Sequence, residues 1–128
     1  MKMIKPVTVK QILTESSKQA MLDKFNSQIF QLQKECEQLR FEMRRNERER
    51  KYDKGSLRLK FEDEIERRHE KSKLLEYQIE QLEILPLGSE LNDGEVETIL
   101  EVNIGDDWDK AAAESAIIIK DGKVYEIR

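Results

Sequence analysis

A heptad pattern of apolar residues runs through residues 16 to 85 and constrains the fold more than any other feature. In its first half, seven residues recur at alternating intervals of three and four: Leu22, Phe25, Ile29, Leu32, Cys36, Leu39 and Met43. An average period of about 3.5 residues is that of a left-handed coiled coil. In the second half the same spacing holds for Phe61, Ile65, Arg68, Ser72, Leu75, Ile79 and Leu82. The sequence therefore predicts two long helices with matching seams.

The segment Asp53-Lys54-Gly55-Ser56 separates the two halves and predicts a turn near residues 52–56. Gly55 suits the left-handed conformation just past a helix end, and Ser56 can cap the next helix. The two helices would then form an antiparallel coiled-coil hairpin over residues 15–85. The alternative is one uninterrupted helix of about 70 residues that pairs with a second chain, since an interior glycine costs only about 1 kcal/mol.

Two registers of the hairpin are compatible with the seam. Folding about Tyr52 places Cys36 near Arg68, whereas folding about Gly55 places Cys36 beside Leu75. The sequence favours the hairpin over the single helix but does not choose between the registers. Because Arg68 and Ser72 are polar seam positions, we expect a soft section in the middle of the hairpin, with the arginine stem reaching outward.

Both ends of the chain predict β-strands. Residues 3–13 and 95–104 alternate between apolar and polar side chains, which is typical of half-buried strands. Asp121-Gly122 between two apolar runs predicts a tight β-hairpin. The carboxyl-terminal segment is too short for a core of its own, so residues 1–14 and 86–128 should form one small antiparallel β unit, with Trp108 as its aromatic anchor. The predicted fold class is α+β.

No catalytic motif is present, so we expect neither an enzyme nor a cofactor. The chain has one histidine, no glycine-rich phosphate loop and no nucleophile elbow. Glu66 and His69 have the spacing of half a di-metal site, but a second such motif is absent. Asp106, Asp107 and Asp109 lack the glycine and the closing glutamate of a calcium loop. Turn chemistry explains them better.

The sequence also predicts a cytoplasmic protein. No run approaches the roughly 18 apolar residues of a membrane span, and residues 1–10 lack the apolar core of a signal peptide. The single cysteine excludes an intrachain disulfide, which fits a reducing compartment.

The net charge of −4 conceals a strong gradient, because residues 44–60 carry +5 and residues 83–128 carry −8. The basic end of the hairpin is a candidate contact for RNA phosphates or for a protein partner. Its candidate residues are Arg44, Arg45, Arg48, Arg50, Lys51, Tyr52, Lys54 and Arg58. Acidic residues interleave with them, however, and such runs are also typical of solvated helix faces with ion pairs four residues apart.

Four apolar residues lie off the seam and are candidates for a protein interface or for self-association: Phe30, Phe41, Leu74 and Tyr77. From these patterns we expect a non-enzymatic interaction or scaffold protein that presents a coiled-coil hairpin to a protein partner. The alternative is an RNA- or ribosome-associated accessory factor that contacts phosphate through the basic end of the hairpin. No small-molecule substrate is evident.

The order of a strand, a long helical hairpin and a compact β end resembles the small bacterial YlqD family. The residues that carry this resemblance are 7–15 at the front, and Gly105-Asp106-Asp107-Trp108 with residues 119–128 at the back. The resemblance covers the whole chain and implies this fold, but it supplies no site residues. The resemblance favours RNA or the translation apparatus as the partner.

Overall fold

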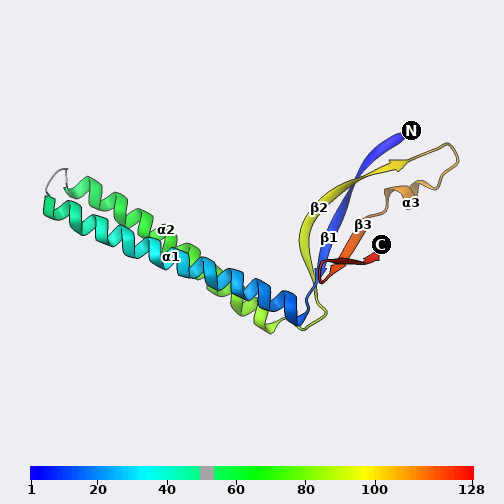
Figure 1. Cartoon of the computed structure of the whole chain (residues 1–128). Coiled ribbons are helices and arrows are strands. Elements are labelled where there is room, and N and C mark those ends of the chain that lie inside the picture. The colour runs from blue at the N-terminus through cyan, green and yellow to red at the C-terminus, as the bar shows by residue number, and fades with distance from the viewer. Residues whose placement is uncertain (50–53) are drawn as a thin grey trace. The chain divides into compact units, whose positions relative to one another are not determined.

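The computed structural model describes residues 1–49 and 54–128. Of Lys54 it describes the backbone but not the side chain. In chain order the elements are β1 (Lys2–Ile12), α1 (Glu15–Glu49), α2 (Lys54–Ile84), β2 (Glu90–Glu101), α3 (Trp108–Ala112), β3 (Ser115–Lys120) and β4 (Lys123–Ile127) (Figure 1). They fall into two compact units: a sheet unit (Met1–Lys18 and Leu85–Arg128) and a helical unit (Gln19–Ile84). The predicted α+β class is confirmed.

In the helical unit, α1 and α2 lie side by side and run in opposite directions (Figure 1). In the middle of the pair, Glu35 of α1 accepts a hydrogen bond from Arg68 of α2 at 3.1 Å. Near the end of α1, Glu47 lies 3.8 Å from Arg58, which is near the start of α2. These contacts confirm the helical hairpin, and the alternative of a single helix of about 70 residues is wrong.

The cross-helix contacts also identify the register. The Cys36 thiol donates to the backbone carbonyl of Ile65 at a sulfur–oxygen distance of 3.9 Å, and Arg68 binds the residue next to Cys36. This is the register obtained by folding the chain about Tyr52, a residue that itself lies outside the described part of the chain. The predicted turn at 52–56 is too long at its end, because Gly55 and Ser56 lie inside α2. The register that would place Cys36 beside Leu75 disagrees with these contacts.

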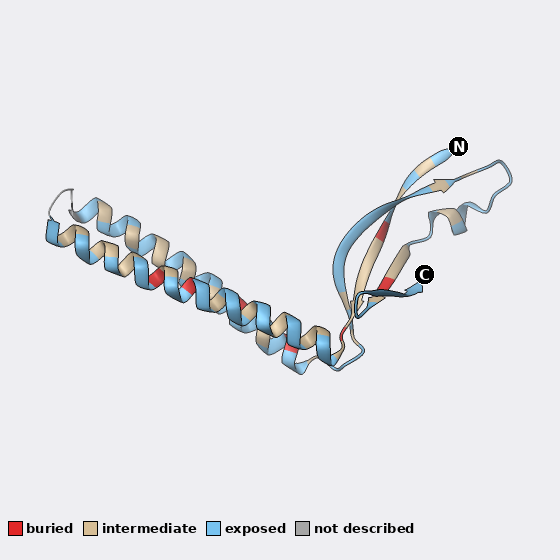
Figure 2. Cartoon of the chain, viewed as in Figure 1, coloured by how far each residue is buried: buried red, intermediate tan, exposed pale blue. Residues whose placement is uncertain are grey.

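The middle of the hairpin is well packed. Leu32, Cys36 and Leu75 keep only 7%, 4% and 6% of their surface exposed and are among the most buried residues of the described chain (Figure 2). The expectation of a soft mid-section is therefore wrong. The seam position of Arg68 does not interrupt this packing, because acidic side chains on both helices hold its guanidinium, as described below.

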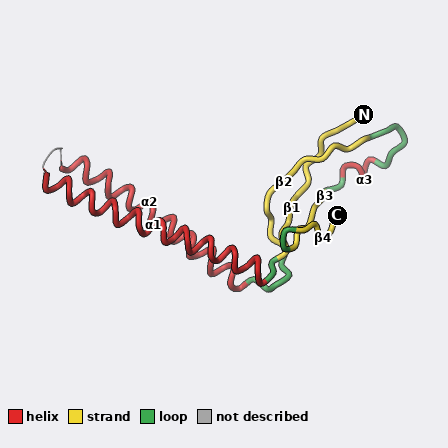
Figure 3. Tube along the Cα trace, viewed as in Figure 1, coloured by secondary structure: helices red, strands yellow, loops and turns green. Residues whose placement is uncertain are grey.

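The sheet has the strand order β2-β1-β3-β4 (Figure 3). The β1–β2 and β3–β4 pairs are antiparallel, but β1 and β3 are parallel. The prediction of an antiparallel sheet is thus wrong for the central pair. Residues 102–114 form a crossover past the end of β1: the chain leaves β2 on one side of β1 and returns on the other as β3, which runs antiparallel to β2 and therefore parallel to β1.

Thr14 provides the amino-terminal cap of α1. Its hydroxyl accepts a hydrogen bond from the backbone N–H of Ser17 at 3.1 Å, and the Ser17 hydroxyl accepts from the backbone N–H of Thr14 at 2.9 Å. The hydroxyls of Thr14 and Ser16 in turn donate to Asp121 Oδ1, at 2.6 and 2.9 Å.

Asp121 and Gly122 form the predicted β3–β4 turn, with φ angles of 48° and 79°. Positive φ at both positions is what a two-residue hairpin turn requires, so this prediction is confirmed. The Asp121 carboxylate therefore joins the turn to the start of α1 within the sheet unit. Hydrogen bonds from Thr14 and then Ser16 hold the pKa of Asp121 below its ordinary value of 3.8.

We expect Asp121→Asn to lower the melting temperature near neutral pH and to have no such effect in acid. Because the folded-state pKa lies below the unfolded one, the carboxylate stabilises the fold above the unfolded pKa of about 4, and this contribution disappears as the pH falls through the folded pKa. Asparagine tolerates positive φ, so the turn is preserved. Thermal unfolding of both proteins between about pH 7 and pH 2 measures the effect, and an equal difference at every pH would contradict it.

Trp108 is not the anchor of the sheet unit, because 58% of its surface is exposed. It begins α3, a five-residue helix in the crossover, whose start is capped by Asp107 through the backbone N–H of Asp109 at 3.0 Å. Asp106 accepts from the backbone N–H of Asn103 at 2.8 Å, so turn chemistry does account for these aspartates. The buried residues of the unit are aliphatic instead: Val7, Leu13 and Ile118.

Candidate interaction surface on the helical hairpin

One surface of α1 combines an aromatic ring with several arginines. The spacing of these residues places them on the helix face opposite the seam residues Leu39 and Met43, and each of them is exposed. We call this the basic surface, and its residues are Phe41, Arg44, Arg45 and Arg48. Together with Glu49 they line a surface cavity of about 240 Å³.

The arginines of the basic surface differ in their ion pairs. Arg45 binds Glu49 at 3.2 Å, four residues along the helix. Arg44 and Arg48, by contrast, contact no carboxylate in the described part of the chain. These two guanidinium groups therefore remain available for a ligand, while that of Arg45 is partly neutralised.

Another predicted contact residue, Arg58, is already engaged within the hairpin. Its guanidinium binds Glu62 at 3.0 Å and lies 3.8 Å from Glu47, and these two carboxylates raise the pKa of Arg58, with the hydrogen bond to Glu62 contributing most. Four further predicted residues are not covered: Arg50, Lys51 and Tyr52 lie outside the described residues, as does the side chain of Lys54.

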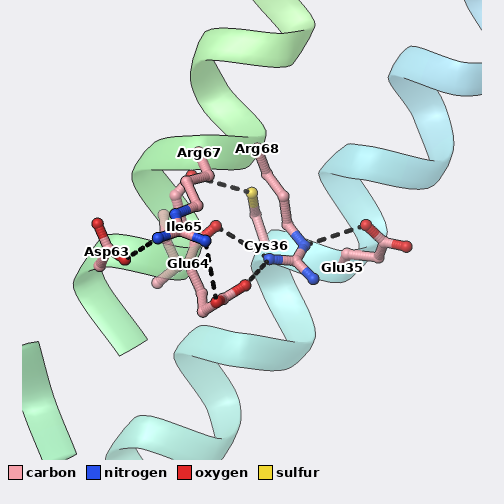
Figure 4. A network of polar contacts seen from close by, with 7 residues as sticks. All are labelled: Glu35, Cys36, Asp63, Glu64, Ile65, Arg67 and Arg68. Atoms are coloured by element: carbon pink, nitrogen blue, oxygen red, sulfur yellow. Dashed lines mark hydrogen bonds and ion pairs between the residues drawn. The ribbon is translucent and has the colours of Figure 1, made fainter. Parts of the chain in front are cut away.

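A network of polar contacts surrounds the seam position Arg68 (Figure 4). Its guanidinium binds Glu64 one turn earlier on α2 at 2.7 Å and Glu35 on α1 at 3.1 Å. These bonds raise the pKa of Arg68 and lower that of Glu64. Arg67 beside it binds Asp63 at 3.2 Å. The Arg68 network joins the two helices at one position and so helps to fix their register, which is a structural role.

The four off-seam apolar residues are all exposed, by 55–58%: Phe30, Phe41, Leu74 and Tyr77. Leu74 and Tyr77 lie one turn apart on α2, whereas Phe30 lies on α1 under the ammonium group of Lys34, 4.5 Å from the ring centroid. Of the four, Phe41 stands out because it lies within the basic surface. The helical spacing of Phe41 and the arginines already places them on one face.

Residues that resembled metal or catalytic ligands have other contacts. His69 Nε2 lies 3.0 Å from Arg40 Nη2 across the helix pair, and Cys36 is buried. No group of three or more potential metal ligands occurs among the residues that the structure describes. Within the same residues, no helix combines the length and the apolar character needed to cross a membrane.

Comparison with known proteins identifies relatives along the whole chain. The model of the family described as "YlqD protein" matches residues 1–128. The "Uncharacterized protein YlqD" of Bacillus subtilis (strain 168) is 42% identical over 128 residues, which are 100% of this chain and 98% of that protein. A crystal structure of a protein of unknown function from Synechococcus sp. WH 8102 has a TM-score of 0.82 at 18% identity and covers 100% of this chain and 96% of that one. At this identity, the likeness concerns the fold alone.

Proposed function

This chain belongs to the YlqD protein family, and from that premise we propose that it is a non-enzymatic interaction protein whose helical hairpin docks on a protein partner. The observation that carries the proposal is the basic surface, where Phe41 is 55% exposed beside Arg44 and Arg48, which pair with no carboxylate among the described residues. An exposed aromatic ring flanked by arginines is typical of the centre of a protein interface.

The chemistry of the basic surface defines the partner. Arg44 and Arg48 each offer a planar, permanently charged donor fork that matches a carboxylate. The ring of Phe41 needs an apolar recess. The fitting partner is thus a protein with an acidic surface around an apolar depression. Because the surface lies on a regular helix packed against a second one, little conformational entropy is lost when it binds.

Binding of RNA is the second candidate function. It is favoured by the absence of carboxylate partners at Arg44 and Arg48 among the described residues, because unpaired guanidinium groups release counterions when they bind phosphate. Phe41 would then stack on an unpaired base. Glu49 in the same cavity and its ion pair with Arg45 reduce the positive potential, so we rank a protein partner first.

A pull-down from bacterial lysate with the full chain, with and without nuclease, separates these functions. The test variant is Arg44→Glu/Arg48→Glu, and the matched control is Lys24→Glu/Lys34→Glu, which reverses two exposed cations elsewhere on α1. We expect a nuclease-resistant protein partner whose recovery falls at least about tenfold with the test variant only, which corresponds to about 1.4 kcal/mol. Nuclease-sensitive capture would support the RNA candidate. Equal losses with both variants, or no captured partner, would overturn the proposal.

A further inference from the structure

The sheet unit buries few of its apolar residues. Among its described residues, Val7, Leu13 and Ile118 are the buried ones, although the unit spans residues 1–18 and 85–128. A β-sheet needs a second layer on its apolar face to be stable in water. Nothing else within the unit forms that layer, because its helical segments are the first residues of α1 and the five-residue α3.

The strand register shows which face lacks a layer. Side chains of cross-strand partners share a face, and the partners Val7–Val96, Val9–Ile117 and Ile117–Ile127 connect all four strands. Continuing this alternation gives what we call the aliphatic face: Met3, Val7, Val9, Leu91, Val96, Leu100, Ile117, Ile119, Val124 and Ile127. The register also places Lys5, Gln11, Thr98 and Ser115 on this face. At one end of it, Gln11 donates a hydrogen bond to Asp93 at 3.0 Å.

Exposure on the aliphatic face increases towards its two edge strands (Figure 2). Val7 in the centre is 5% exposed, whereas Val96 on β2 is 47% exposed. On β4, Val124 and Ile127 are 61% and 76% exposed. Apolar side chains with such large exposed fractions are unfavourable in water unless another surface covers the face.

The opposite face carries more charge, although the cross-strand partners Ile4 and Ile99 lie there and are 69% and 70% exposed. At one end, Glu90 binds Arg128 at 2.9 Å and lies 3.9 Å from Lys10. Along β2, alternation places Glu95, Glu97 and Glu101 in a row on this face. Two copies stacked on this opposite face would bring like charges together, so self-association there is disfavoured.

We propose that the aliphatic face is the interface between two copies of this chain, with the two sheets packed face to face around a twofold axis. An aliphatic face is complementary to itself, and a twofold axis uses the same patch from both copies. The face offers no charge pattern that would select a different protein. The pairing is independent of the hairpin's proposed partner.

The available area fits a dimer. The exposed parts of Val96, Val124 and Ile127 and of their less exposed aliphatic neighbours amount to roughly 500 Å² per copy. Stacking two copies therefore removes about 1,000 Å² of apolar surface from water, which reaches the lower bound of a specific interface.

Sedimentation equilibrium of the full chain tests the dimer, with threonine variants that keep the β-branched shape strands prefer. We expect the natural chain to be dimeric at about 50 μM, and Val96→Thr/Ile127→Thr to raise the dimer dissociation constant at least about 50-fold, since each change occurs twice per dimer. The matched control is Ile99→Thr, which is 70% exposed on the opposite face of β2, and it should leave the constant unchanged.

Three results would overturn the proposal. They are a monomeric natural chain at about 50 μM, an unchanged dissociation constant in Val96→Thr/Ile127→Thr, or an equal loss in Ile99→Thr. A circular dichroism spectrum and a melting temperature for each variant below the dissociation constant show whether the monomer is folded. If the test variant does not fold, the single variant Ile127→Thr at the 76% exposed position replaces it, with an expected rise of at least about fivefold.

Discussion

Leu75→Ala is expected to lower the free energy of unfolding of the helical unit by about 2–4 kcal/mol. Leu75 is 6% exposed and lies on the seam of α2, and Leu32 and Cys36 are buried seam residues of α1. Truncating it removes the apolar surface it buries and leaves a cavity that a pair of long helices closes only in part. Urea unfolding followed by the helical circular dichroism signal measures the change.

Leu74→Ala is the matched control, because the neighbouring leucine is 57% exposed on the same helix. It should change the free energy of unfolding by less than about 0.5 kcal/mol. If the two variants were equally stable, the seam of the hairpin would not lie where the structure places it. The comparison therefore tests which face of α2 forms the seam as well as the packing.

The melting temperature after replacement of Arg68 is expected to depend on the new side chain. Arg68→Ala removes the guanidinium from Glu35 and Glu64 and leaves a gap on the seam, so the melting temperature should fall by about 4–8 °C. Arg68→Leu also removes the ion pairs but restores an apolar seam residue, and exchanging a partly buried ion pair for good packing is often neutral or stabilising. We expect its melting temperature to match or exceed that of the natural chain.

The same two variants report what the Arg68 network contributes. If Arg68→Leu were as unstable as Arg68→Ala, the ion pairs themselves would be required for stability. A spin-label distance measured across the two helices, with labels near positions 29 and 75, shows whether Arg68→Leu retains the register. We expect retention, because the buried Leu32, Cys36 and Leu75 remain to specify it.

The parts of the fold that depend on local patterns were predictable from the sequence. The seam that includes Leu32, Cys36 and Leu75 predicted the helical hairpin, because burial on a helix repeats every three or four residues. Asp121-Gly122 predicted its turn, because few residues other than glycine, asparagine and aspartate adopt positive φ there.

The parts that depend on distant contacts were not predictable. The parallel pairing of β1 with β3 follows from where residues 102–114 cross the sheet, which no local pattern encodes. Trp108 was expected to be buried because it is large and aromatic, but its position in the crossover leaves it exposed. The register became clear only through side chains that meet across the two helices, such as Glu35 and Arg68.

The candidate site was predictable as a basic region but not in its detail. The spacing of Arg45 and Glu49 and of Arg58 and Glu62 already indicated pairs four residues apart. Which arginines lack a carboxylate depends also on cross-helix pairs such as Arg58 with Glu47. Of the predicted contact residues that the structure describes, those of the basic surface on α1 therefore remain the candidates for binding a partner.

Site-specific photocrosslinking tests most directly the claim that the basic surface docks on a protein. A photoreactive phenylalanine analogue replaces Phe41 in one culture and exposed Gln33, elsewhere on α1, in another. The account predicts that position 41 yields a covalent adduct with a discrete protein, and that Arg44→Glu/Arg48→Glu abolishes it, while position 33 yields at most a weak adduct. Equal adducts at both positions, or none at position 41, would contradict the account.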